Sequence, residues 1–182
     1  GYKGEGNPER LQALCGELGI GCDIIPKVVQ DHITISSTYI RTLLQNGDMQ
    51  EAMRFLGHPH CLSGTVVHGR QLGRTIGVPT ANLLIPDGVL TPAFGVYATK
   101  VALPDGQEKL AVTNVGVRPT VGESTLVTVE PWILDFEGDL DGQHIRVDFY
   151  CRLRGEKRFD GLVALQQEIF SNAEETRGLL GG

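Results

Sequence analysis

The stretch "GVYATKVALPDGQEKLAVTNV", from Gly95 to Val115, contains two apolar, β-branched runs joined by the turn residues "LPDGQ" at 103–107. β-branched and aromatic residues favour strands, and a Pro–Asp–Gly turn between two such runs is typical of a hairpin. Neighbouring strands joined this tightly must run antiparallel. The stretch therefore predicts an antiparallel β architecture.

Four more runs of the same kind surround this hairpin, at 61–68, 80–85, 125–136 and 144–153. Six strands with no helical pattern between them favour an antiparallel barrel or sandwich. The chain then continues with "FDGLVALQQEIF", for which the apolar spacing predicts a C-terminal helix capped by Asp160. Its inward face is expected to carry Leu162, Leu165, Ile169 and Phe170.

The first 56 residues have a different character, because their apolar spacing is mostly helical. Three short helices are predicted there. They are expected to begin at Asn7, Ser37 and Asp48 and to end at Gly19, Gly47 and Gly57. Since these pieces are too few to bury one another, we expect two domains, 1–56 as the tail of a larger domain and 57–182 as the β domain.

The overall composition limits the classes of function. The 182 residues carry a formal net charge of −6, which argues against broad binding to a nucleic-acid backbone. The sequence shows no apolar run of membrane-spanning length and no signal peptide. Four cysteines without a CxxC pair make a reducing cytoplasm the expected setting.

The motif "GVPTANL", from Gly77 to Leu83, places a hydroxyl and a carboxamide two residues apart. Side chains two residues apart in a strand project from the same face, so Thr80 and Asn82 should share one. Their uncharged polar groups suit contact with a hard cation or with phosphate oxygens. The preceding segment, 64–77, is rich in glycine and carries Arg70 and Arg74, as expected of a loop that approaches an anion. A Gly-rich turn that satisfies its own backbone remains an equal alternative.

Glu130 is the candidate base, because it shares a strand face with apolar neighbours such as Trp132. A carboxylate in such surroundings is costly unless it has a partner or a chemical role. The alternative is a solvated face or an ion pair with an arginine. Pro131 cannot donate to a sheet ladder and therefore marks an edge or a bulge.

Two polar segments complete the candidate site. "TNVGVRPTVG" at 113–122 reads as a connection, either an ordinary loop or a flap that offers Arg118 to an anion. "RLRGEKRF" at 152–159 is either a solvated turn or a support for the polar edge of a ligand. The chain contains no Walker A motif and no GxGxxG between a strand and a helix.

Together, "GTVVHGRQLGRTIGVPTANL", "NVGVRPT", the "VE" at 129–130 and "RLRGEKRF" resemble riboflavin kinase. The match is closest to the kinase module of bacterial bifunctional riboflavin kinase/FMN adenylyltransferase. This resemblance implies a mainly β fold, a six-stranded antiparallel Greek-key barrel with a C-terminal helix. "ISSTYIR" at 35–41 resembles the second nucleotide-binding motif of the adenylyltransferase, an α/β nucleotidylyltransferase domain.

The resemblance also implies an activity and roles for single residues. The expected reaction phosphorylates riboflavin with MgATP to give FMN and ADP, with Mg²⁺ as the cofactor and neither nucleic acid nor membrane as a partner. Glu130 would be the general base, and Thr80 and Asn82 would bind the metal. The phosphate loop would use Gly69, Gly73, Arg74 and Gly77, and the flavin side or flap would use Asn114, Arg118, Arg154 and Phe159.

Departures from the family pattern occur at Val78, Pro131, Trp132 and Asp141, and they concern the substrate side more than the reaction type. The HxGH-type histidine pair of the adenylyltransferase is missing, so 1–56 is expected to be a remnant that does not make FAD. Three alternatives remain. They are a fragment of a bifunctional enzyme that makes FAD when full length, a flavin-binding barrel without kinase activity, and an inactive regulatory module.

Overall fold

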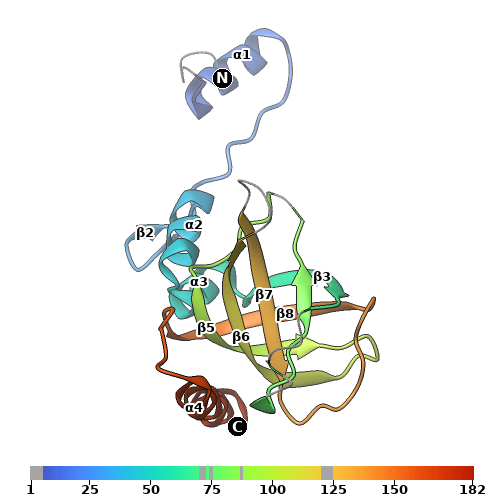
Figure 1. The fold of residues 1–182 in the computed structure, drawn as a ribbon. Helices are drawn as coiled ribbons and strands as arrows, with labels where there is room; N and C mark the ends of the chain where they lie inside the picture. Colours follow the sequence, from blue (N-terminus) through green and yellow to red (C-terminus); the bar gives the residue numbers. More distant parts are fainter. Residues whose placement is uncertain (1–5, 70–72, 74–75, 87, 120–124) are drawn as a thin grey trace. The chain divides into compact units, whose positions relative to one another are not determined.

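The computed structural model describes the chain except residues 1–5, 70–72, 74–75, 87 and 120–124 (Figure 1). Two compact units divide between Ser36 and Ser37. No helix among the described residues is long and apolar enough to cross a membrane.

The first unit begins with helix α1 (Pro8–Glu17), whose start is set by its cap. Asn7 accepts a hydrogen bond from the Arg10 backbone N–H at 2.8 Å, and Pro8 occupies the first turn, where no N–H is needed. Gly19 follows the helix with a φ of 67°. The predicted start and stop are therefore confirmed. A two-stranded ribbon, β1 (Val29–Gln30) and β2 (Ile33–Thr34), completes this unit.

The second unit contains a closed barrel of six antiparallel strands (Figure 1). Their order around the barrel is β3-β4-β7-β6-β5-β8. Strands β5, β6 and β7 form a meander and β8 returns beside β5, which is a Greek key. The predicted six-stranded Greek-key barrel is therefore confirmed. The strands are β3 (His60–Val67), β4 (Asn82–Leu84), β5 (Gly95–Ala102), β6 (Glu108–Pro119), β7 (Thr125–Ile133) and β8 (His144–Arg154).

The interior of the barrel is filled by its own side chains. Tyr97 and Phe149 meet edge to face with ring centroids 5.3 Å apart, and both are fully buried. Two buried hydroxyls are paired with each other, since Thr99 and Thr113 lie 2.7 Å apart and Thr99 also donates to the Ala111 carbonyl. A ligand must therefore bind outside this packed core.

Helices α2 (Ser37–Asn46) and α3 (Met49–Leu56) belong to the second compact unit. Gly47 and Gly57 follow them with φ values of 83° and 78°, so both predicted stops are confirmed. The Ala93 N–H donates to the Leu44 carbonyl at 2.9 Å, which ties α2 to the segment before β5. The division into domains 1–56 and 57–182 stays a prediction.

Helix α4 (Leu162–Leu180) packs on the outer face of β5 and β6 (Figure 1). Its Ala173 joins Val96, Val112 and Leu134 in a second apolar cluster outside the barrel. The helix is the predicted C-terminal one.

One expectation about α4 was wrong. Gly161 precedes the helix and no side chain caps it, so Asp160 is not the cap. Leu162, Leu165 and Ile169 do face the barrel, because they line a cavity there, and Phe170 packs edge to face on Trp132. The fully buried positions of the helix are nevertheless further on, at Asn172, Ala173 and Thr176. The reason is that the helix continues to Leu180, so its second half packs on the sheet and its first half lies over a cavity.

The segment 113–119 is a strand rather than the connection we expected. Its pairing with β7 runs without a break from Ala111↔Ile133 to Pro119↔Thr125, and that ladder satisfies the backbone of the segment. Residues 120–124, the rest of the expected connection, lie outside the described residues.

Candidate active site

The largest described cavity, of about 590 Å³, lies between the outer face of the barrel and the first half of α4. Residues of β5, β6 and β7 form one wall. Gly73, Ile76, Val78 and Thr80, the segment 154–159 and helix α4 form the others. Gln166 of α4 donates to the Ile76 carbonyl at 2.8 Å, so the helix and the Gly-rich segment touch at the rim.

Glu130 reaches this cavity because of strand register. It pairs with Asn114, which pairs with Val96, and opposite residues in a sheet project from the same face. Val96 packs against α4 outside the barrel, so Glu130 and Asn114 project outward as well. Glu130 is half-buried, and Trp132 follows it on the same face, as the sequence indicated.

The Pro131 backbone faces the point where β4 begins. Its carbonyl accepts a hydrogen bond from Ala81 N–H at 3.0 Å, just before β4 begins at Asn82. Since N and C=O of a strand residue point the same way, the missing N–H of Pro131 also lies on this side. Pro131 therefore lies at the end of the β4–β7 pairing within a closed barrel, and the ladder with β6 shows no bulge, so the prediction of an edge or a bulge is not confirmed.

The same register brings the metal-ligand candidates to the candidate base. Leu83 pairs with Val129, and Ala81 bonds to Pro131. This antiparallel register places Asn82 opposite Glu130, and opposite residues have Cβ atoms about 4.5–5.5 Å apart. The Asn82 carboxamide and the Glu130 carboxylate thus lie on adjacent strands at the edge of the cavity.

The Gly-rich segment approaches this pair closely. A Cβ at Gly69 would overlap the Asn82 carboxamide, and a Cβ at Gly73 would overlap the Val78 carbonyl oxygen. The Val78 N–H also donates to the Gly73 carbonyl at 2.8 Å, which closes the segment in front of Thr80. Glycine is required at Gly73, where a side chain would meet backbone, whereas at Gly69 a side chain would displace the Asn82 carboxamide.

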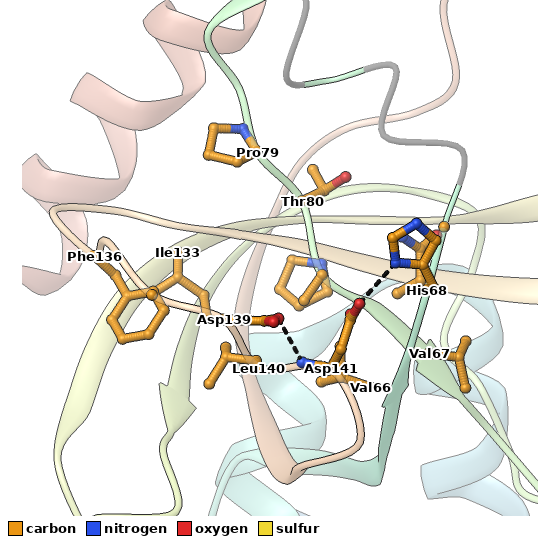
Figure 2. Close-up of a pocket in the computed structure, with 15 residues that line it drawn as sticks. Val66, Val67, His68, Pro79, Thr80, Ile133, Phe136, Asp139, Leu140 and Asp141 are labelled. Atoms are coloured by element: carbon orange, nitrogen blue, oxygen red, sulfur yellow. Dashed lines mark hydrogen bonds and ion pairs between the residues drawn. The ribbon is translucent and has the colours of Figure 1, made fainter.

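A smaller cavity of about 80 Å³ lies on the other side of Thr80. Thr80 and Asn82 both line it, together with Pro79 and Ala81, so their predicted common face stays a prediction. Figure 2 shows His68 and Asp141 facing each other across its rim, with the His68 Nδ1 and an Asp141 carboxylate oxygen 2.7 Å apart. Thr80 also lines the larger cavity, so the two cavities meet at this residue.

The far end of the larger cavity is formed by Arg154 and Phe159. The Arg154 guanidinium lies over the Phe159 ring, 5.4 Å from its centroid. Burial lowers the pKa of Arg154, and the nearby Glu168 carboxylate opposes this shift. Both residues line the cavity that Glu130 enters.

The structure thus brings most of the predicted site residues together. Gly77, the first residue of the GVPTANL motif, has a φ of 73° and lines neither cavity. Arg118 has its backbone in β6, and Arg74 lies outside the described residues. The predicted site residues that line at least one of the two cavities are Gly69, Gly73, Thr80, Asn82, Asn114, Glu130, Arg154 and Phe159. Their chemical roles stay predictions.

The sequence assigned no role to His68 or Gln166. His68 lies within the quoted motif but drew no prediction, and Gln166 lies in no motif; the contacts of both join segments far apart in the chain. Asn172, a buried polar residue near the site, lies beyond the predicted helix face.

The six-stranded barrel, with a carboxylate opposite a carboxamide at a cavity edge, can be compared with known proteins. The family model described as riboflavin kinase matches residues 56–180. The chain belongs to the riboflavin kinase family.

Individual relatives are longer than this chain. It is 38% identical over 157 residues to the bifunctional riboflavin kinase/FMN adenylyltransferase of Bacillus subtilis, which covers 85% of this chain and 49% of that protein. The protein of the same description from Escherichia coli K12 is 38% identical over 178 residues, with 97% and 56% covered. The chain spans about half the length of these relatives.

Two solved structures share the fold. Riboflavin kinase from Trypanosoma brucei matches with a TM-score of 0.51 and 30% identity, over 68% of this chain and 81% of that one. A Streptococcus pneumoniae structure, described as a macrolide-efflux protein, matches with a TM-score of 0.83 and 34% identity, over 95% and 55%.

The Gly73 contact leads to a stability prediction. Gly73→Ala should lower the free energy of unfolding by about 1–3 kcal/mol, the usual cost of forcing a methyl group into a packed position. Gly178→Ala in α4, where an added Cβ meets nothing within 4 Å, should raise it by up to about 1 kcal/mol. Urea unfolding of both variants measures the difference. Equal effects would contradict the close approach at Gly73.

Proposed function

We propose that this chain transfers the γ-phosphoryl group of ATP to the 5′-hydroxyl of the riboflavin ribityl chain, which gives FMN and ADP. The observation that carries the proposal is the register that sets Asn82 opposite Glu130 at the edge of the large cavity. Phosphoryl transfer needs positioning and charge neutralisation, together with a base for the attacking hydroxyl.

The phosphates and their metal would bind where the two cavities meet. The Thr80 hydroxyl and the Asn82 carboxamide are neutral oxygen donors, which suit Mg²⁺ held together with phosphate oxygens. The Gly69 and Gly73 backbones approach these side chains closely enough to cover the phosphates. Bound Mg²⁺ would neutralise the charge that develops on the transferred group.

Riboflavin would bind in the larger cavity. Its wall includes Trp132 and Phe159, and α4 adds the apolar side chains of Leu162, Leu165 and Ile169. Such a surface suits a flat, largely apolar ring system. As the hydroxyl oxygen bonds to the γ-phosphorus, its proton would pass to the Glu130 carboxylate and the bond to ADP would break.

We limit the proposed activity to the kinase reaction. The curated relatives are described with two activities, and this chain spans about half their length. Residues 1–56 lack the HxGH-type pair expected of an adenylyltransferase. The cytoplasmic setting and the expected lack of nucleic-acid and membrane partners also stay predictions.

The first test identifies the products. Incubation with riboflavin and MgATP should yield FMN and ADP, and incubation with FMN and MgATP should yield no FAD. Chromatography of both mixtures separates the alternatives. FAD formation would favour the bifunctional alternative, and flavin binding without ATP consumption would favour the non-kinase barrel.

The second test concerns the metal ligands. Thr80→Ala and Asn82→Ala should each lower kcat/KM for MgATP by on the order of 10²-fold, because each removes an oxygen ligand from the transferred phosphate's metal. Thr65→Ala, at an exposed position on neighbouring β3, is the matched control and should keep parent kinetics. Steady-state rates at several Mg²⁺ concentrations measure the effect. If both variants keep the parent rates and the parent Mg²⁺ dependence, the motif is a structural turn and not a metal site.

The third test concerns the base. Glu130→Gln keeps the shape of the side chain but cannot take up the hydroxyl proton, so kcat should fall by about 10²–10⁴-fold. Riboflavin affinity should change little. The control is Glu108→Gln at the exposed start of β6. A stably folded Glu130→Gln variant that retains at least half the parent kcat would refute the general-base role.

A further inference from the structure

Asn172 is a buried polar residue on the face of α4 that packs against the barrel. Its side chain is 4% exposed, and its neighbour Ala173 lies in the apolar cluster with Val96 and Val112. The Asn172 Oδ1 accepts a hydrogen bond from the Arg154 Nε–H at 3.1 Å. A carboxamide is costly in such a place unless it is hydrogen-bonded, so this contact fixes both side chains.

Arg154 is held from several directions. Its side chain is 18% exposed, and its Nε lies 3.4 Å from a Glu168 carboxylate oxygen. Its Nη1 donates to the Gly155 carbonyl at 3.2 Å, and the Phe159 ring lies beside the guanidinium. These contacts give the guanidinium plane one orientation.

The remaining donors of Arg154 are available to a ligand. A guanidinium has five N–H groups, and the hydrogen bonds to Asn172 and Gly155 use two of them. Within the described residues, three N–H groups are left by these bonds, on a side chain that lines the large cavity. Carbonyl oxygens of a ligand are suitable acceptors for such a planar set.

Strand register gives the approximate distance between Arg154 and the candidate base, Glu130. Glu130, Asn114, Val96 and Arg154 lie side by side on β7, β6, β5 and β8. Three inter-strand spacings separate the first from the last, or about 14 Å along the sheet. Arg154 is therefore too far away to contact the transferred phosphoryl group. It lies where the ring end of a long acceptor would be when its hydroxyl meets Glu130.

We infer that Asn172 is a positioning residue for the acceptor: it orients Arg154 so that the guanidinium donates to the carbonyl oxygens of the flavin ring. This inference rests on the proposed function for the identity of the acceptor. Through this contact, a residue of the C-terminal helix that does not line the cavity sets the affinity for riboflavin and leaves the phosphate side unaffected.

A purely structural role for Asn172 is the competing explanation, because the contact also holds α4 on the barrel. The helix has a second attachment that serves as a control. Arg177 of α4 donates to both carboxylate oxygens of Asp135 at 3.0 and 3.1 Å, away from the cavity residues. Loss of this pair loosens the same helix without touching Arg154.

The experiment compares Asn172→Leu, Asn172→Asp and Arg177→Gln. Leucine has a similar volume but no acceptor, whereas aspartate keeps an oxygen for the Arg154 Nε–H. Quenching of flavin fluorescence gives the riboflavin Kd, thermal unfolding gives Tm, and steady-state rates give kcat and the KM for ATP. We expect the leucine variant to raise the riboflavin Kd about tenfold, as for loss of a charged hydrogen bond, with kcat and the ATP KM within about twofold.

The aspartate variant should retain the parent Kd within about threefold, and Arg177→Gln should lower Tm and leave the Kd unchanged. Arg154→Gln should weaken riboflavin binding, and adding Asn172→Leu to it should weaken binding no further. An unchanged Kd in the leucine variant, an equal loss in the aspartate variant, the same Kd shift in Arg177→Gln, or additive effects in the double variant would each overturn the inference.

These outcomes are separable from failure of the proposed function. If the parent chain binds riboflavin with the expected variant pattern but forms no FMN, the proposed kinase activity fails and the positioning role stands. If the parent forms FMN and the Kd of Asn172→Leu equals that of the parent, only the positioning role fails. If the parent does not bind riboflavin, both are overturned.

Discussion

The packed interior of the barrel is the constraint from which the rest of the site follows. Six strands close around side chains such as Tyr97, Phe149 and the paired Thr99 and Thr113, and these described side chains fill the interior. Alternate residues of each strand must then serve the outer face. Glu130 and Asn114 are such outward residues, and their neighbours Val129 and Val115 fill the interior. The alternation of side chains along each strand thus provides both the core residues inside and the candidate site residues outside.

An outer face can bind a ligand only when something else forms the second wall, and α4 provides it. The second half of the helix is attached through Ala173 and through the Arg177–Asp135 pair. Its first half spans the cavity and touches the Gly-rich segment through Gln166. The apolar residues of that half are therefore not core residues, although their spacing indicates burial. They line a site whose apolar surface a ligand would cover.

The sequence predicted this architecture well wherever local signals agreed with packing. The hairpin at 95–115, the other four strands and the helix stops at Gly47 and Gly57 follow from propensity, turn chemistry and glycine's access to positive φ. Predictions failed where a long-range partner decided the outcome. Residues 116–119, beyond the predicted hairpin, read as part of a polar connection, but β7 supplies a ladder for them. The helix face at Asn172 depends on the Arg154 side chain, 18 residues earlier in the chain.

By itself, the sequence determined the strand alternation that sends Glu130 outward, the pairing of Thr80 with Asn82 on one face, and the motifs that resemble riboflavin kinase. These are local properties, set by the two-residue period of a strand and by the chemistry of each side chain. Only the tertiary structure decided that Asn82 lies opposite Glu130 and that Arg154 lies three strands away from it. Register and strand order between distant segments depend on how the whole barrel closes, and no local pattern encodes that closure.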